Sequence, residues 1–391
     1  MAKYLVVFGT RPEAIKMAPV LRALKGDPQV TCIACCTGQH EELLTPILSL
    51  FRIEPKYQLR VMSVDQQLSG LTSLLLTQLE KVMVTERPDR VLVQGDTTTA
   101  MVAAMAACYL KIPVAHIEAG VRSHHALEPF PEEMNRKVID VMSDLFFAPT
   151  PVERNHLLLE GVPSAQVYVT GNTSIDALSH VSSMPFAMRG TVLEKLPLHK
   201  RIILATMHRR ESHGLVLKNI CDAIRVIARR YRLTAHIVIP VHPNPNVHGI
   251  VHRCLAGIPN ITLTAPLEYR ELIGLANLTH FALTDSGGLQ EELTWLGKPA
   301  LVLRNVTDRR AAIDAGAALL VGVDPEIIVG AASRLMDDPG LYARMARSRD
   351  LFGDGRAAVR IAQILEHHHA AVGARHRVGE LGDMSSLRPA A

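Results

Sequence analysis

Three carboxylates in the first half of the chain stand where they could exchange protons with a substrate. Asp96 follows the apolar run RVLVQG, Glu118 interrupts the apolar stretch HIEAG, and Glu132 follows Pro131 at an expected helix start. An acid inside an apolar stretch is uncommon unless it is paired or functional. Asp96 can also be explained as the N-cap of the helix that follows. The three residues are candidates for acid–base chemistry.

A glycine turn in the second half of the chain could bind an anion. The stretch LTDSGGLQEE, residues 283–292, is typical of a strand end, a tight turn at Ser286-Gly287-Gly288 and a helix start. Free N–H groups at a helix N-terminus attract anions, and small residues let the anion approach. We expect Glu291 and Glu292 in the first helical turn, where the helix dipole tolerates negative charge. The stretch predicts a phosphate site beside a partner for hydroxyl groups, although an ordinary turn with a helix start also explains it.

Basic residues follow the first strand of each half. Arg11 and Lys16 come after YLVVFG, and His208 and Arg209 come after RIILATM. Arginine forks and lysine charges suit phosphate oxygens. The first turn is not GxGxxG and no acid ends the second strand, so the dinucleotide fingerprint is absent. Phosphate-binding residues together with several carboxylates indicate a nucleotide-linked substrate and acid–base chemistry at carbon.

Short apolar runs alternate with helical patterns along the whole chain. The expected strands are 4–9, 30–36, 90–95, 113–120, 145–149 and 166–171, then 201–207, 235–241, 261–266, 281–285, 299–303 and 318–322. Helical periodicity covers, among others, 98–110, 132–143, 214–230 and 325–337. This alternation is typical of parallel sheets covered on both faces. We predict an α/β protein of two doubly wound Rossmann-like domains facing a cleft, joined by a linker at 178–200.

The composition is that of an ordinary globular protein. Of 391 residues, 48% are hydrophobic and 20% charged, and the net charge is only +4. Aromatic residues make up 4% and there is no basic block, which argues against a nucleic-acid partner. The cysteines of CIACC (Cys32, Cys35 and Cys36) are interpreted as buried thiols, because the sequence contains no second Cys/His pair at the spacing of zinc ligands. Without a signal peptide or a run of 18 apolar residues, we expect a cytoplasmic protein that needs no membrane.

The motifs as a set resemble those of the bacterial non-hydrolysing UDP-N-acetylglucosamine 2-epimerases, from about residue 3 to 368. The stretches that carry the resemblance are FGTRPEAIKMAP, TGQH, GDTTT, HIEAGVR, PEEMNR, TGNTSIDAL, HRRES, PVHPNPNV, LTDSGGLQEE and LGKPAL. The resemblance implies a glycosyltransferase-B-like fold and a cytoplasmic homodimer. Because the chain lacks both a dinucleotide fingerprint and a metal cluster, we expect no cofactor and no metal. The domains expected from it are 1–172, a UDP-binding domain at 173–355, and a helix at 356–370 that crosses back to the first domain. Residues 371–391 lack periodicity and are expected to be a disordered tail.

The resemblance also implies a reaction and a set of roles. UDP leaves C1 as a base takes the C2 proton, which gives 2-acetamidoglucal, and UDP then adds back with a proton from the opposite face. UDP-N-acetylglucosamine becomes UDP-N-acetylmannosamine, a precursor of surface polysaccharide. By position, Asp96, Glu118 and Glu132 match the catalytic acids, His208 the histidine near the diphosphate, and Glu292 the ribose partner. The residues matching phosphate and nucleotide contacts are Arg11, Lys16, Ser286, Gly287, Gly288 and Arg309.

Some family members bind a second UDP-N-acetylglucosamine as an activator, and this chain retains Gln39, Arg210 and His242 from that second site. It departs from the family at Glu42, where Gln is common, and at Gln66, where Arg is common. TDRRAA replaces the usual TERPEA, and the loop SHHALEPF is also unlike its counterpart. The loop keeps open an epimerase of a modified UDP-hexosamine, such as a diacetamido-uronic acid. A glycosyltransferase of the same fold is a further alternative, as is a nucleotide-sugar sensor, which would have lost the acids.

Overall fold

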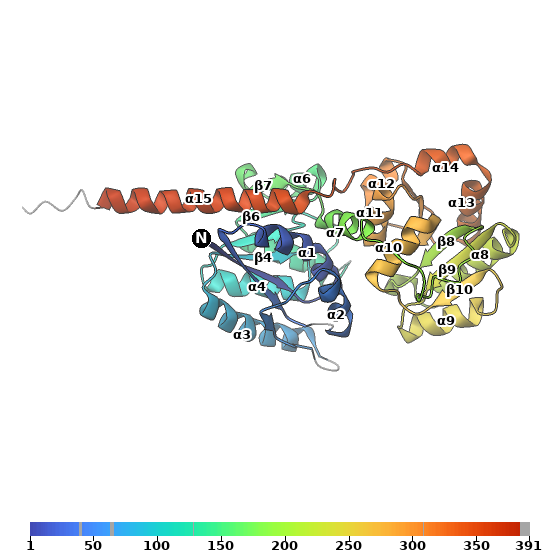
Figure 1. Ribbon diagram of the computed structural model, residues 1–391, viewed down its shortest axis with the longest axis horizontal. Helices are drawn as coiled ribbons and strands as arrows, with labels where there is room; N and C mark the ends of the chain where they lie inside the picture. The colour runs from blue at the N-terminus through green and yellow to red at the C-terminus, as the bar shows by residue number, and fades with distance from the viewer. Residues whose placement is uncertain (39–40, 63–65, 128, 308, 384–391) are drawn as a thin grey trace, which may run out of the picture. The chain divides into compact units, whose positions relative to one another are not determined.

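The computed structural model describes residues 1–38, 41–62, 66–127, 129–307 and 309–383 (Figure 1). The chain forms two compact units. The first comprises Met1–Ala177 together with the chain from Gly353 onward, and the second is Leu178–Phe352. The division falls after Ala177 rather than at the predicted 172, because the buried side chains of Ile175 and Ala177 keep the start of the following helix in the first unit.

The first unit contains one parallel sheet in the order β3-β2-β1-β4-β5-β6-β7. Its strands are β1 (Ala2–Phe8), β2 (Val30–Cys36), β3 (Tyr57–Gln58), β4 (Arg90–Gln94), β5 (Val114–Ile117), β6 (Leu145–Ala148) and β7 (Val167–Val169). The predicted strands of this half are all present, with ends shifted by a few residues. β3 is additional, because a two-residue edge strand leaves no apolar run in the sequence.

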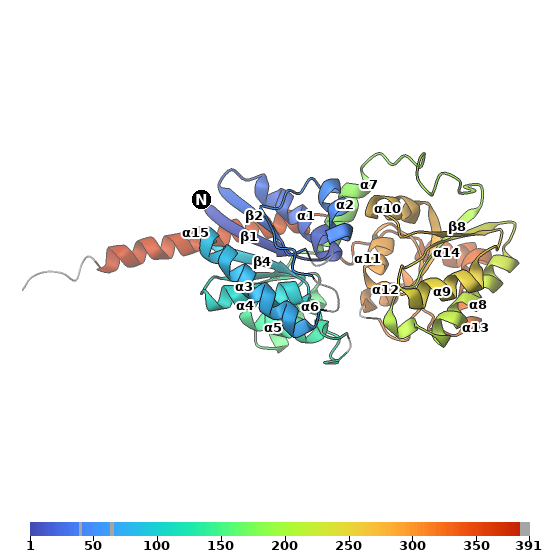
Figure 2. The same cartoon turned by 90° about the horizontal axis from the view of Figure 1, so that it is seen from below.

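Helices cover both faces of this sheet (Figure 2). They are α1 (Arg11–Lys25), α2 (Glu41–Leu50), α3 (Leu68–Glu86), α4 (Thr98–Tyr109), α5 (Glu132–Met142), α6 (Pro151–Leu159), α7 (Thr173–Ser182) and α15 (Ala357–Asp383). On one face α4 packs between α3 and α5, and on the other α1 packs against α2 and α15. Strand side chains are buried on both faces, which is why the sequence shows continuous apolar runs there.

The last helix, α15, is fastened to the first unit. Asp176 accepts hydrogen bonds from the first N–H groups of α15, at Ala357 (3.1 Å) and Ala358 (2.8 Å). Farther along, the Tyr4 hydroxyl donates to the Leu365 carbonyl at 3.1 Å. The helix continues to Asp383, past residue 370 where a disordered tail is predicted. Residues such as Ala, Arg and Glu favour helix without forming an apolar face, so periodicity does not reveal this part.

The second unit contains a parallel sheet in the order β10-β9-β8-β11-β12-β13. Its strands are β8 (Arg201–Thr206), β9 (Ala235–Pro240), β10 (Ile261–Thr264), β11 (Thr279–Thr284), β12 (Ala300–Val302) and β13 (Ala318–Leu320). Its helices are α8 (Leu215–Arg230), α9 (Pro245–Leu255), α10 (Tyr269–Leu278), α11 (Gly287–Trp295), α12 (Arg310–Asp314), α13 (Pro325–Asp337) and α14 (Pro339–Met345). A core of aliphatic side chains joins α8, α9 and α13 to one face of the sheet. The prediction of two doubly wound α/β domains is confirmed.

The strand orders locate the places where ligands bind in folds of this class. In each sheet the order reverses beside the first strand: between β1 and β4 in the first unit, and between β8 and β11 in the second. Ligands of doubly wound proteins bind at the carboxyl ends of the strands at such a reversal. We therefore expect ligand-binding residues directly after β1 and β4 in the first unit, and directly after β8 and β11 in the second.

Candidate active site

The reversal in the first unit is held by a buried carboxylate, Glu13. It accepts N–H groups of Gly9 (3.0 Å) and Thr10 (2.8 Å) and the hydroxyl of Thr97 (2.7 Å). Burial raises the pKa of Glu13, although these hydrogen bonds oppose the rise. Gly9 has no room for a side chain, since a Cβ would lie 2.2 Å from the Thr37 hydroxyl oxygen. The start of α1 is thereby fixed against the turn that follows β4.

Glu118 lies just beyond β5 in a backbone conformation that is uncommon for its residue type. Its φ is +67°, in the left-handed region. Such conformations persist only where the surroundings enforce them, and they cluster at functional sites. The carboxylate is nearly buried and contacts the ammonium of Lys16 and the side-chain amide of Gln94. Lys16, predicted to bind phosphate, thus pairs with a predicted catalytic acid.

Asp96 is bound by α5 rather than acting as a helix cap. Its carboxylate Oδ2 lies 2.6 Å from Nη2 and 2.8 Å from Nε of Arg136. Its carbonyl accepts a hydrogen bond from the side chain of Asn135 at 2.8 Å. The N-cap of α4 is Thr97, whose side chain accepts from the Ala100 N–H at 3.0 Å. The capping interpretation of Asp96 is therefore wrong, and its charge is held in place by an arginine.

The two glutamates at the start of α5 have different environments. One oxygen of Glu132, Oε2, is buried and accepts no hydrogen bond from any residue that the structure describes. Glu133 is fully buried and accepts the N–H groups of Ser123 (2.9 Å) and His124 (3.2 Å) and Nη1 of Arg136 (3.2 Å). Burial alone would raise the pKa of Glu133, but these partners hold it below its ordinary value. Glu133 therefore anchors the loop that precedes α5, whereas Glu132 keeps an oxygen for a proton.

In the second unit, Asp285 after β11 organises the residues after β8. Its Oδ2 accepts the N–H groups of His208 (2.8 Å) and Arg209 (2.9 Å), and its Oδ1 lies 2.8 Å from Nδ1 of His208. Asp285 is fully buried, and although burial raises its pKa, His208 and the N–H groups lower it overall. A carboxylate on Nδ1 leaves Nε2 of the partly exposed His208 for a ligand. Asp285 is not among the site residues that the sequence predicts.

Two guanidinium groups flank the N-terminus of α11. Ser286 is the N-cap, and its hydroxyl accepts from the Leu289 N–H at 3.3 Å. A Cβ on Gly287 would lie 3.7 Å from both Arg209 Nη2 and Arg309 Cζ. Nε of Arg209 is buried and donates to no described residue. Helix N–H groups, a serine hydroxyl and two arginines together can hold a diphosphate.

Glu291 and Glu292 lie in the second turn of α11, not in the first as predicted. With Ser286 as N-cap, the first turn is 287–290 and contains no acid. Glu291 instead accepts Nε of Arg309 at 2.7 Å, which orients that guanidinium. Glu292 is buried and accepts the Tyr269 hydroxyl at 3.0 Å. These contacts link the predicted phosphate and ribose partners through one helix.

The residues predicted for a second site are described only in part. Gln39 lies outside the described residues, and Arg210 begins a short 3₁₀-helix, Arg210–Ser212, by its backbone. His242 is exposed, and its ring stacks on that of His208 with centroids 6.1 Å apart. Partial desolvation of the ring, followed by the charge of His208, lowers the pKa of His242.

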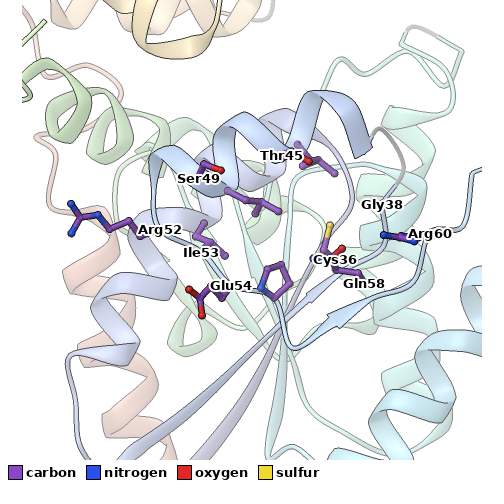
Figure 3. Close-up of a pocket in the computed structure, with 12 residues that line it drawn as sticks. Cys36, Gly38, Thr45, Ser49, Arg52, Ile53, Glu54, Gln58 and Arg60 are labelled. Carbon is purple, nitrogen blue, oxygen red and sulfur yellow. The ribbon is translucent and has the colours of Figure 1, made fainter.

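A cavity of about 560 Å³ in the first unit lies apart from these clusters. It is bounded by α2, β2 and β3, and its lining includes Cys36, Thr45, Ser49, Gln58 and Arg60 (Figure 3). Thr45 and Ser49 project from α2, and Cys36 and Gln58 lie across from them. None of the predicted catalytic acids lines it.

The cysteines of β2 are free thiols, and burial raises the pKa of Cys32 and of Cys35 to about 12. Within the described ranges, no three His, Cys, Asp or Glu side chains are grouped to hold a metal ion. No helix in that part of the chain is both long and apolar enough to cross a membrane.

Comparison with known proteins gives first the fold class and then the family. A structure of a kitacinnamycin glycosyltransferase, 12% identical, has the same fold with a TM-score of 0.63 over 94% of this chain and 98% of its own. The family model described as UDP-N-acetylglucosamine 2-epimerase matches residues 22–366, and the chain belongs to this family. The Yersinia pestis UDP-N-acetylglucosamine 2-epimerase is 44% identical over 373 residues, covering 94% of this chain and 99% of that protein. The Neisseria meningitidis enzyme, solved with UDP-GlcNAc bound, is 42% identical with a TM-score of 0.88, covering 93% and 100%.

Proposed function

We propose that this protein interconverts UDP-N-acetylglucosamine and UDP-N-acetylmannosamine by epimerisation at C2. Family membership supports the proposal, and so does the division of labour between the two strand-order reversals. The second unit supplies positive charge and helix N–H groups suited to a diphosphate. The first unit supplies three carboxylates that follow the carboxyl ends of β4 and β5 or begin α5: Asp96, Glu118 and Glu132. The observation that carries the proposal is the buried Oε2 of Glu132, which accepts no hydrogen bond from any described residue, at the start of the helix whose Arg136 holds Asp96.

The proposed chemistry is an elimination followed by an addition. The C1–O bond breaks, its electron pair stays on the β-phosphate oxygen of UDP, and a carboxylate takes the C2 proton as the C1–C2 double bond forms. The guanidiniums of Arg209 and Arg309, with the N-terminus of α11, stabilise the charge that develops on UDP. The glycal then regains UDP at C1 and a proton at C2 from the other face. Since no electrons leave the substrate, the reaction needs no oxidant.

The three carboxylates differ in how side chains of the protein bind them. Lys16 and Gln94 orient Glu118, and Arg136 orients Asp96, so each carboxylate is held in a fixed position. Glu132 has an oxygen without a hydrogen bond among the described residues and is our candidate for the proton transfer on one face of C2, while Asp96 or Glu118 exchanges the proton on the opposite face. On this proposal Glu292 binds the ribose hydroxyls, and Arg11 and His208 bind phosphate.

We further propose that the enzyme works as a cytoplasmic homodimer that supplies a surface polysaccharide. The state of association can be tested by light scattering of the purified protein, where a mass near twice 42.8 kDa is expected. A monomeric mass at full activity would contradict the dimer.

A modified UDP-hexosamine is the second candidate substrate. The loop that distinguishes this chain from its relatives begins at Ser123, and Glu133 fixes its first two N–H groups. His124 packs edge-on against His156, with ring centroids 5.0 Å apart. Ser123 and His124 are thus held beside α5, and the sequence of this loop favours a test with diacetamido-uronic substrates.

Proton NMR of UDP-N-acetylglucosamine with the protein in deuterated water tests the proposal. We expect UDP-N-acetylmannosamine to appear with deuterium at C2. Free N-acetylmannosamine and UDP would indicate a hydrolysing enzyme instead. An unchanged spectrum, with turnover of a diacetamido-uronic analogue, would establish the second candidate. Sugar transfer to an acceptor without exchange at C2 would indicate a glycosyltransferase.

A further inference from the structure

The fully buried ring of His116, on β5, lies between two hydrogen-bond acceptors. Nε2 is 2.8 Å from the carbonyl oxygen of Gly95, and Nδ1 is 2.6 Å from Oδ1 of Asp140. A carbonyl oxygen can only accept, so Nε2 carries a proton. A neutral ring would then have to accept a hydrogen bond at Nδ1. The state of Asp140 therefore decides the charge of the ring.

Asp140 is an ionised carboxylate in this environment. Its second oxygen, Oδ2, accepts a hydrogen bond from the buried guanidinium of Arg122. Burial raises the pKa of Asp140, but His116 and Arg122 together hold it below its ordinary value. An ionised carboxylate has no proton to donate, so Nδ1 of His116 must donate as well. With both nitrogens donating, the ring is an imidazolium.

The charges around His116 balance in this state. Arg122 also binds Glu160 through Nε at 2.8 Å and Nη2 at 2.6 Å, so the cluster holds two carboxylates and the guanidinium. With a charged His116 the four groups sum to zero, although Glu160 lies at the exposed rim of the cluster and only His116, Asp140 and Arg122 are buried. The register neighbours of His116 in the sheet, Val93 on β4 and Phe146 on β6, carry no charge.

The cluster joins the three segments that carry the predicted catalytic acids. Gly95 precedes Asp96 and adopts a left-handed φ of +69°, and its N–H bonds to the Ile117 carbonyl at 3.0 Å. With its carbonyl on His116, the turn is fastened on both sides to β5, which leads into Glu118. Asp140 lies on α5, whose first residue is Glu132. One buried ring thus connects the turn before Asp96, the strand before Glu118 and the helix that begins with Glu132.

We propose that His116 is a positioning residue for the proposed epimerisation: a buried imidazolium that fixes the Gly95–Asp96 turn to β5 and α5. It touches no substrate in this role and acts through the carboxylates that it aligns. The proposal rests on the proposed function for its kinetic part, while the charge of the ring can be tested without any turnover.

Nitrogen NMR of protein labelled with ¹⁵N-histidine tests the charge at pH 8. An ordinary histidine, with a pKa of about 6.5, is mostly neutral there. We expect one ring with protons on both nitrogens, and the His116→Gln variant identifies it by the loss of its signals. A His116 ring with one bare nitrogen at pH 8 would overturn the assignment.

Kinetics of three variants test the positioning. His116→Phe fills the space and removes both hydrogen bonds, and we expect kcat to fall about 10- to 100-fold, as small misplacements of catalytic groups do. KM should change less than about twofold, since most of the proposed phosphate contacts (His208, Arg209, Arg309 and the N-terminus of α11) belong to the other unit. In Asp140→Asn the ring can lose its charge yet still donate Nε2–H to Gly95, so kcat should fall less than about threefold. Tyr4→Phe, which removes a buried hydrogen bond to α15, is the matched control and should keep wild-type kcat.

Wild-type exchange of deuterium at C2 is measured first, so that a failure of the proposed function is recognised separately. Given an active wild type, unchanged kcat in His116→Phe, or a raised KM alone, would overturn the positioning role. If His116→Phe does not fold, His116→Gln replaces it, because the amide can still donate to Gly95 or Asp140 but not to both. Its kcat should then lie below that of Asp140→Asn, and equal values would count against the proposal.

Discussion

Arg136 approaches a single oxygen of Asp96 with two nitrogens, Nε at 2.8 Å and Nη2 at 2.6 Å. Its third nitrogen, Nη1, is 3.2 Å from Glu133, which holds the loop that begins at Ser123. One guanidinium therefore sets the position of Asp96, a predicted catalytic carboxylate, relative to the loop that begins at Ser123.

Replacing each predicted catalytic acid by its amide should stop the chemistry while preserving shape. We expect Asp96→Asn, Glu118→Gln and Glu132→Gln each to lower kcat by about two to four orders of magnitude, the usual scale of acid–base contributions. UDP affinity, measured by calorimetry, should change little, because most of the residues proposed to bind the diphosphate belong to the other unit. The matched control is Glu326→Gln, an exposed acid on α13, which should retain full activity. Near wild-type turnover in all three variants would refute the assignment.

The arginines beside α11 should dominate UDP binding. Arg209→Gln and Arg309→Gln each remove a charge-assisted hydrogen bond worth roughly 1.5–3 kcal/mol. We therefore expect the Kd for UDP to rise by roughly 10- to 150-fold in calorimetric titrations. Arg225→Gln, which removes an exposed partner of Asp222 on α8, should leave the Kd unchanged. Equal affinities in all four proteins would show that the diphosphate binds elsewhere.

The sequence predicts the fold well because both sheets are buried on both faces. A continuous apolar run such as VTCIACC predicts a buried strand, and β2 spans the predicted residues 30–36. β3, with two residues at the sheet edge, pairs only through Cys35 and Cys36 and has no comparable run. The sequence beyond residue 370 lacks a periodic apolar pattern, so it does not reveal that the helix continues there.

The sequence predicts fewer of the contacts in the candidate site than of the strands in the fold. An aspartate before Ser-Gly-Gly suits a turn as well as a buried anchor, so Asp285 could not be told apart from a turn residue. The left-handed φ of Glu118 follows from tertiary contacts, and sequence rules expect glycine there. Arg136 was within reach: it follows Glu133 by three residues, the spacing at which helical side chains meet. Lys16 and Glu118, far apart in the chain, meet only through the sheet topology.

Protonation of His280 should destabilise the second unit in acid. Its ring stacks on Tyr342 with centroids 4.0 Å apart, and burial, with a smaller effect of Arg201, lowers its pKa to about 4. The unfolded chain binds this proton near pH 6.5 and the folded one only near pH 4. The contribution of the neutral His280 ring to folding stability is therefore complete above about pH 6.5 and is lost as the pH falls toward 4. The Tm of His280→Phe should fall less between pH 7 and pH 5 than that of the wild type, and identical slopes would contradict this assignment.

Turnover should not depend on an added divalent metal. In the proposed mechanism Arg209, Arg309 and the N-terminus of α11 already supply the positive charge that meets the leaving diphosphate. We expect protein dialysed against a chelator to keep its rate in a metal-free assay without NAD. Loss of activity that magnesium or manganese restores would overturn this prediction.

Activation by a second UDP-N-acetylglucosamine should be weak or absent. Glu42 would place a negative charge where relatives commonly have Gln, and Gln66 replaces a common arginine. Partial desolvation and His208 lower the pKa of His242, so its ring is neutral at pH 7.5 and offers no charge to a second diphosphate. We expect a hyperbolic dependence of rate on substrate, and a reverse reaction from UDP-N-acetylmannosamine that starts without a lag. The double variant Glu42→Gln/Gln66→Arg should make the curve sigmoidal by restoring the missing partners. A sigmoidal curve in the wild type would instead show that Arg210 and His242, with Gln39, suffice for activation.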